Sequence, residues 1–374
     1  MRKINIIHAI LIIVLFHNCI DPYNPPEITA ERSHLVIDGN YIAGEASQVK
    51  LSMTQNLNDD QETQVIAGAN VQLEDGEERS FEYIEISPGV YQLPATDIPL
   101  NTLVRLKVAW QGQQYLSQYV SILPTPEIDS VNFSIEDDGI QFYVNTNDPN
   151  NNTRYYRWRY SETWQLTSAF QSNFIFEDGE VVNRTDDIYT CWDSDESKEI
   201  YVGTSNNLEQ DVIYLFPLHK VAANSQRLRI KYSVLVEQYA LTREAHDYYK
   251  ELKNNTENLG TLFDPLPFQL NGNFTNTSSP EEPVIGYFYA VKPTRSRIFV
   301  TPNDHEFFIR NNLSSTCELD TVLTADVPDE AGSKLIVSEY YSEFGPGILG
   351  YFMASPRCVD CRFRGTNVEP EFWQ

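Results

Sequence analysis

The chain has 374 residues, 41% of them hydrophobic, and its 27 Lys and Arg stand against 53 Asp and Glu, a formal net charge of −26 at pH 7. This charge argues against nucleic acid as a partner, because proteins bind phosphate backbones through basic surfaces. The excess acid indicates a solvated exterior that keeps neighbouring molecules apart, with an acidic docking surface as the alternative.

The first predicted element is a signal peptide over residues 1–18. Basic residues precede an apolar run from Ile6 to Phe16, which is too short to span a bilayer and is typical of an export signal. Cys19 follows at the place where bacterial lipoproteins are cleaved and acylated, although Phe16-His17-Asn18 departs from the usual leucine, small residue, and glycine or alanine. We predict that Cys19 is lipidated and anchors the chain to a membrane; a plain secretory peptide and a retained anchor are the alternatives.

Residues 19–33 contain three prolines and no hydrophobic periodicity, which predicts an extended tether. Residues 34–123 alternate between strand-forming runs and turn signals, which predicts strands at 35–37, 49–53, 69–73, 81–86, 90–93, 103–108 and 115–120. Strands of this number and spacing predict an Ig-like β-sandwich. Residues 68–73 and 89–91 also resemble the transthyretin-like or carboxypeptidase-regulatory module, which implies a spacer or docking role and no activity.

Residues 124–374 are predicted to form a larger β-rich domain, so the fold class is mainly β. The run at 155–160 has strand alternation, with Tyr156, Trp158 and Tyr160 on one face and Arg157 and Arg159 on the other. We interpret the aromatic face as core, with a sugar-stacking platform as the alternative.

One amphipathic helix is predicted over residues 243–255. Thr242 is a suitable N-cap, and an apolar face follows at helical spacing through Ala245, Tyr248, Tyr249 and Leu252. We expect this helix to pack on a β-sheet.

Residues 168–208 are polar and lack periodicity, which predicts a long loop that is either functional or disordered. Its aromatic residues are candidate contacts with a partner protein: Phe170, Phe174, Phe176 and Trp192. Its acidic segment at 193–196 raises the alternative of a calcium site, but it lacks the glycine and terminal glutamate of an EF-hand, so we predict solvated acid.

Four cysteines remain besides Cys19, namely Cys191, Cys317, Cys358 and Cys361. An even number in an exported chain predicts two disulfides, whose pairing the sequence leaves open. Half a zinc site or a redox dithiol is the alternative for the C-x-x-C pair, but the second half of a zinc motif and a βαβ context are missing.

No catalytic motif stands out in the sequence. The histidines are scattered singly, and neither G-x-S-x-G, H-E-x-x-H nor a P-loop occurs. We predict no catalytic residue, cofactor or metal. A carboxylate-based envelope hydrolase, for example one directed at glycans, stays open as the alternative, because its two acids meet only in the fold.

Several segments together resemble one family. They are Cys19-Ile20-Asp21-Pro22, Leu35-Val36-Ile37-Asp38-Gly39, the runs at 155–160 and 232–274, and the ending Cys358-Val359-Asp360-Cys361-Arg362-Phe363-Arg364-Gly365 with Pro370 and Phe372-Trp373. The chain resembles the Bacteroidota lipoproteins grouped as a domain of unknown function, DUF4249.

That resemblance implies an outer-membrane lipoprotein, facing either the periplasm or the cell surface, of a kind often encoded beside TonB-dependent receptors. It therefore implies an accessory or binding role with such a transporter, with a free-standing surface coat protein as a further alternative. It supplies no functional residues to carry over.

Overall fold

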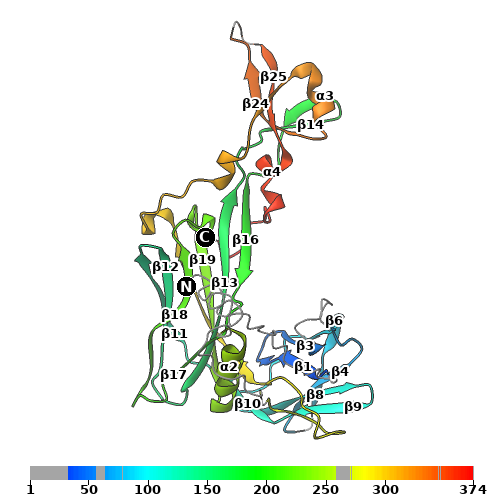
Figure 1. Cartoon of the computed structure of the whole chain (residues 1–374), viewed down its shortest axis with the longest axis vertical. Helices are drawn as coiled ribbons and strands as arrows, with labels where there is room; N and C mark the ends of the chain where they lie inside the picture. The colour runs from blue at the N-terminus through cyan, green and yellow to red at the C-terminus, as the bar shows by residue number, and fades with distance from the viewer. Residues whose placement is uncertain are drawn as a thin grey trace, which may run out of the picture.

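The computed structural model describes residues 33–55, 64–77, 79–257, 270, 272–343, 345 and 347–373. The chain forms an N-terminal sandwich, a central sandwich and, beyond the far end of the central one, a smaller part that we call the distal module (Figure 1). The prediction of a mainly β fold that begins with a β-sandwich is confirmed. Among the described helices, none is long and apolar enough to cross a membrane. The predicted signal peptide, Cys19 and all of the tether except Ser33 lie outside the described residues.

The N-terminal sandwich has two sheets. One sheet contains, in order, β1 (Leu35–Gly39), β3 (Ser47–Met53), β7 (Val90–Leu93) and β6 (Ile84–Ser87). The other contains, in order, β2 (Tyr41–Ile42), β21 (Ala290–Lys292), β10 (Val120–Pro124), β8 (Leu103–Trp110), β4 (Asn70–Asp75) and β5 (Ser80–Glu82). In addition, β9 (Gln113–Ser117) pairs with β8, and β20 (Phe274–Asn276) pairs with β9.

Period-two alternation builds the core of this sandwich. In β8 the side chains of Val104, Leu106 and Val108 are fully buried and their neighbours are more exposed, as expected for a strand with one face on the core. The run predicted as one strand at 81–86 is instead β5 and β6, which pair in different sheets on either side of the buried Tyr83.

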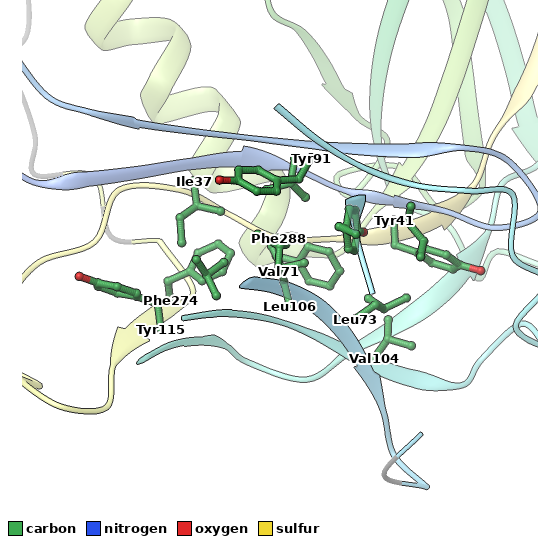
Figure 2. Close-up of a cluster of buried hydrophobic side chains, with 14 of the residues drawn as sticks. Ile37, Tyr41, Val71, Leu73, Tyr91, Val104, Leu106, Tyr115, Phe274 and Phe288 are labelled. Atoms are coloured by element: carbon green, nitrogen blue, oxygen red, sulfur yellow. The ribbon is translucent and has the colours of Figure 1, made fainter. Parts of the chain in front are cut away.

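A late segment of the chain returns to complete the N-terminal sandwich. Strand β21 pairs in parallel with β10, and Phe274 and Phe288 pack in the same core as Ile37 (Figure 2). Gly286 makes the close approach possible, since it has a φ of 146° and an added Cβ would lie 2.1 Å from the carbonyl oxygen of Ile37. The predicted first domain, residues 34–123, did not include this return, because parallel pairing requires a long crossover that local pattern does not reveal.

Most of the central sandwich is formed by the chain within that crossover, and its last strand follows β21. Its smaller sheet contains β11 (Ile128–Glu136), β12 (Gly139–Asp148) and β18 (Asp211–Ala222); its larger sheet contains β16 (Thr190–Glu196), β13 (Tyr155–Thr167), β19 (Tyr232–Leu241) and β22 (Thr294–Val300), with β17 (Tyr201–Thr204) also on β13. Tyr156 and Trp158 are fully buried here, and the indole of Trp158 donates to Gln238 Oε1 at 2.8 Å. The core interpretation of the aromatic face is confirmed.

The predicted helix is α2 (Arg243–Thr256), and the Thr242 side chain accepts from the Ala245 amide as its N-cap. Tyr248 and Tyr249 are buried in a cluster that also holds residues of both sandwiches, including Ile42 of β2 and Val291 of β21. The helix therefore packs on the larger central sheet, as expected, and also fills the junction between the two sandwiches (Figure 1).

The distal module contains the three-stranded sheet β23 (Asp320–Leu323), β25 (Ile348–Ala354) and β24 (Leu335–Tyr341), the hairpin β14 (Phe174–Glu177) and β15 (Glu180–Asn183), and the short helices α3 (Val327–Glu330) and α4 (Pro356–Val359). Its core includes Ile336 and Met353, against which Phe174 packs. A module this small has little apolar surface to bury, so cross-links contribute much of its stability.

Two disulfides cross-link the segments around the distal module, and the one at Cys191 reaches the central sandwich. Cys191 of β16 bonds to Cys361, and Cys317 bonds to Cys358 of α4. The prediction of two disulfides is confirmed, and the C-x-x-C pair serves two different cross-links.

Residues 168–208 do not form a long loop, so that prediction is wrong. They contain β14 and β15 of the distal module, and β16 and β17, which pair with β13. These strands are short, and in β16 Asp193 and Asp195 are half-buried and Glu196 is exposed, so the apolar alternation that marks a strand is missing from the sequence.

Candidate functional site

A cleft of about 440 Å³ lies where the N-terminal and central sandwiches meet, and we call it the junction cleft. Its walls come from β1 and the β2–β3 turn on one side, and from β13 and residues 196–200 on the other. The tyrosines at 239, 249 and 289 line it as well, from β19, α2 and the return segment. Segments far apart in the chain thus converge on one space.

Arg157 is the distinctive residue of the junction cleft. Strand alternation in β13 buries Tyr156 and Trp158 in the central core and turns Arg157 the other way. Its guanidinium lies over the ring of Tyr249, 4.1 Å from the centroid, and Nη1 donates to the Tyr289 hydroxyl at 3.1 Å. Its buried Nε has no hydrogen-bond partner. Within the described residues, no carboxylate lies within ion-pair distance of this guanidinium, although Asp38 of the cleft acts on it at longer range, so its Nε is left as a charged donor without an acceptor.

Tyr289 is held in position from three sides. Asn40 donates to its hydroxyl at 3.0 Å, and the rings of Tyr239 and Tyr249 meet its ring edge to face, with centroids at 6.5 and 5.8 Å. Burial raises the pKa of both Tyr239 and Tyr249, so these phenols stay neutral at physiological pH. The result is a rigid, neutral aromatic wall beside a fixed cation.

Two other cations that line the cleft, Arg159 and Lys198, differ from Arg157, because carboxylates already pair with them. Arg159 lies 3.3 Å from Glu196, and Lys198 lies 3.7 Å from Asp195, both at exposed positions. Exposed pairs of this kind contribute little energy. Arg157 differs from these two cations, because its buried Nε has no acceptor.

A second polar group of residues lies inside the central sandwich around Glu162, which is only 2% exposed. Its carboxylate accepts from the Tyr232 hydroxyl at 2.6 Å and from Arg227, and His219 Nε2 lies 3.2 Å away. Burial alone would raise the pKa of Glu162, but the bonds to His219, Tyr232 and Arg227 outweigh burial and hold the pKa below its ordinary value. The group is an ionised, satisfied network that stabilises the core.

The carboxylates whose pKa shifts are resolved all shift in one direction. A general acid needs a raised pKa, whereas each described carboxylate with a resolved shift has a lowered pKa, namely Glu74, Asp75, Asp138, Asp148, Glu162, Asp195, Asp304 and Asp360. The described part of the chain also holds no group of three or more His, Cys, Asp or Glu residues placed to bind a metal. In the acidic segment considered for calcium, Asp195 instead pairs with Arg227 and Glu196 with Arg159.

The four candidate partner contacts lie at buried or half-buried positions. Phe170 packs beside the buried Val337, Phe174 and Phe176 pack in the core of the distal module, and Trp192 is 8% exposed. They are not the exposed anchors that a docking surface requires. The sequence analysis selected these residues because they are aromatic and stand in a polar segment. That segment folds into short strands, and other parts of the chain cover their aromatic side chains.

The sequence analysis placed Arg157 correctly, opposite the aromatic core face, but gave it no role. Tyr249 was assigned to the apolar face of the helix, and Tyr289 was not singled out. The sequence feature that could have indicated the site is an arginine in a strand between two buried aromatic residues. The residues that cover this arginine come from α2 and the return segment, which the local sequence does not reveal.

These features define a mainly β protein of several modules with a polar, tyrosine-lined cleft at the junction of two sandwiches. The chain belongs to the family described as a domain of unknown function (DUF4249), which matches residues 20–297. The resemblance to this family is thereby confirmed, although the C-terminal cysteine motif lies beyond the matched residues.

No curated protein matches the chain. Among solved structures, a segment of two fibronectin type-III domains from chicken tenascin is similar at 9% identity, over 55% of this chain and 91% of the tenascin chain, with a TM-score of 0.15. So low a TM-score supports no argument about this protein.

Proposed function

We propose that this chain is a non-enzymatic binding protein of the cell envelope, held at the outer membrane through lipidated Cys19, and that it acts as an accessory to a TonB-dependent transporter by binding a small solute in the junction cleft. The observation that carries the binding role is the Arg157 guanidinium, which has no carboxylate partner among the described residues and lies against a neutral tyrosine wall. Mostly preformed clefts with a few fixed polar groups are typical of ligand sites.

The solute should offer an acceptor group to Arg157 and a flat or apolar face to the tyrosines. A carboxylate suits the guanidinium best, because the two form short, charge-assisted hydrogen bonds. The absence of a raised carboxylate pKa among the described residues favours recognition over acid–base catalysis.

The solute can be tested by purifying the protein gently, denaturing it and identifying released small molecules by mass spectrometry. Wild type and Arg243→Gln should release the same solute, and Arg157→Gln should release little. Arg243 is the matched control because it carries the same charge at an exposed position on α2, outside the residues that line the cleft. Equal release from all three proteins would contradict the role of Arg157.

The anchor and the partner need separate measurements. Metabolic labelling with a fatty-acid analogue should mark the wild type and leave Cys19→Ala unlabelled; equal labelling would refute the anchor. A mild-detergent pull-down with an affinity tag after Gln374 should recover a large outer-membrane receptor together with the wild type. Recovery of this protein alone, at several salt concentrations, would leave a free-standing envelope protein as the correct description.

A further inference from the structure

A second pocket, distinct from the junction cleft, lies at the opposite end of β13. It has a volume of about 330 Å³, and we call it the arginine pocket because Arg229 and Arg364 line it. Both guanidiniums converge on one residue: Nη2 of Arg229 donates to Thr167 Oγ1 at 2.6 Å, and Nη2 of Arg364 donates to the Thr167 carbonyl oxygen at 3.0 Å. The indole of Trp164 forms part of the wall.

Neither arginine has a counter-ion among the described residues. Asp193 is the acid in the pocket lining, and it forms no ion pair with either guanidinium in the described part of the chain. Nε of Arg364 is buried and has no hydrogen-bond partner. In a chain with 53 Asp and Glu, two adjacent arginines without a carboxylate partner are a marked departure from the surrounding charge.

The two guanidiniums are placed unfavourably for their charges. Burial lowers the pKa of both arginines, and the charge of Arg229 lowers the pKa of Arg364 further. A guanidinium cannot relieve such a cost by losing its proton at physiological pH. An anion bound between the two groups would relieve it.

The backbone around Arg364 is fixed. Cys361 ties this segment to β16 through its disulfide with Cys191, and Thr366 exchanges two backbone hydrogen bonds with Trp192, at 2.8 and 2.9 Å. Gly365 allows this close approach, since an added Cβ would lie 2.4 Å from the Trp192 carbonyl oxygen. The C-terminal Cys-Arg-Phe-Arg-Gly sequence therefore presents Arg364 to the pocket from a rigid support, which reduces the entropy that a ligand would have to overcome.

We propose that the arginine pocket is a binding site for a multiply charged oxyanion, a phosphate group either free or carried by a sugar. Two planar guanidiniums with several donors each match the geometry and charge of phosphate better than those of a single carboxylate. Trp164 and Leu166 line the pocket beside the arginines and supply the apolar part of its wall. The pocket is separate from the junction cleft, so this proposal does not depend on the solute-binding function.

The test is calorimetric titration of the intact protein with inorganic phosphate, glucose 6-phosphate and glucose, at constant ionic strength so that screening does not change. Phosphate should bind, and glucose should not. Arg229→Gln and Arg364→Gln should each weaken phosphate binding by about tenfold or more, the factor expected for losing one charged hydrogen-bonding group. Arg243→Gln is the matched control, because it removes the same charge from an exposed position on α2 and should change the affinity by less than about twofold.

Tighter binding of glucose 6-phosphate than of inorganic phosphate would identify a sugar phosphate as the ligand class, and equal affinities would identify the free ion. Absence of phosphate binding to the wild type would overturn the proposal, as would equal weakening by the control variant. If a pocket variant fails to fold, nuclear magnetic resonance of a chain that keeps both arginines decides the question. The chain carries Cys19→Ala, which removes the predicted lipidation site, and the arginine ¹⁵Nε–¹Hε signals are followed as phosphate is added. Phosphate must shift the signals of Arg229 and Arg364 more than that of Arg243.

Discussion

Truncating Phe288 to alanine tests whether the return segment is part of the N-terminal sandwich. This side chain is fully buried in the core that β1, β4 and β8 build (Figure 2). Removing the ring forfeits about 2–3 kcal/mol of transfer free energy. A residual cavity of roughly 100 Å³ would add about 2 kcal/mol at ~24 cal/mol per Å³. We expect a total loss of about 4 kcal/mol in the free energy of opening this sandwich.

Hydrogen exchange read by mass spectrometry can assign that loss to one module. A loss of about 4 kcal/mol speeds exchange close to a thousandfold where the amides exchange by opening of the sandwich. The effect should appear in peptides of β4 and β8 and leave those of β19 unchanged. Phe308→Ala is the matched control, because Phe308 is 84% exposed. Unchanged protection of β8 in Phe288→Ala, or the same change in both variants, would refute the reasoning.

Two further predictions concern cross-links and charge. By loop-closure entropy, removing the disulfide Cys191–Cys361, whose ends are 170 residues apart, should lower the free energy of unfolding by about 5 kcal/mol, and removing Cys317–Cys358, whose ends are 41 residues apart, by about 4 kcal/mol. Denaturant unfolding of the two double-alanine variants checks this order. A larger loss for the shorter loop would contradict the prediction. Glu162→Gln should destabilise the protein most at neutral pH, because a carboxylate with a depressed folded-state pKa stabilises above its unfolded pKa of about 4.3 and loses that effect as the pH falls. Unfolding curves between about pH 7 and pH 3 should show the difference from wild type narrowing, and a constant difference would count against an ionised Glu162 in the native state.

The local sequence pattern was sufficient to predict a helix or strand wherever one face of the element packs on a core and the other faces solvent. The alternation in β8 and the aromatic face of β13 were predictable for this reason, and so was α2 with its Thr242 cap. In each case the physical signal lies within about ten consecutive residues, because the period of the side chains is fixed by backbone geometry.

The local sequence pattern was insufficient to predict a strand where the segment that packs on it comes from a distant part of the chain. Strands β14 to β17 are short, and the half-buried aromatics of β14 pack on the distal sheet, which the chain forms more than 130 residues later. The return segment is similar: β20 and β21 have only three residues each, and their place in the N-terminal sandwich depends on Phe274 and Phe288 reaching a core built much earlier. Short strands carry too few side chains for a period to be visible.

The same reasoning explains why neither site could be located from the sequence. Alternation in β13 says that Arg157 faces away from the central core, but only the arrival of α2 and of the return segment turns that position into a tyrosine-lined cleft. Arg229 and Arg364 are 135 positions apart in the chain and meet because the disulfide at Cys361 brings the C-terminal segment onto β16. In a chain with so many acidic residues, most arginines are expected to form an ion pair with a carboxylate. Where a guanidinium forms no ion pair, the fold must hold the carboxylates out of ion-pair distance. Both arginine sites lie where separate segments of the chain are held together by a rigid contact. Substitutions at Arg157 and Arg364 therefore test ligand binding directly, whereas substitutions in either sandwich core test stability.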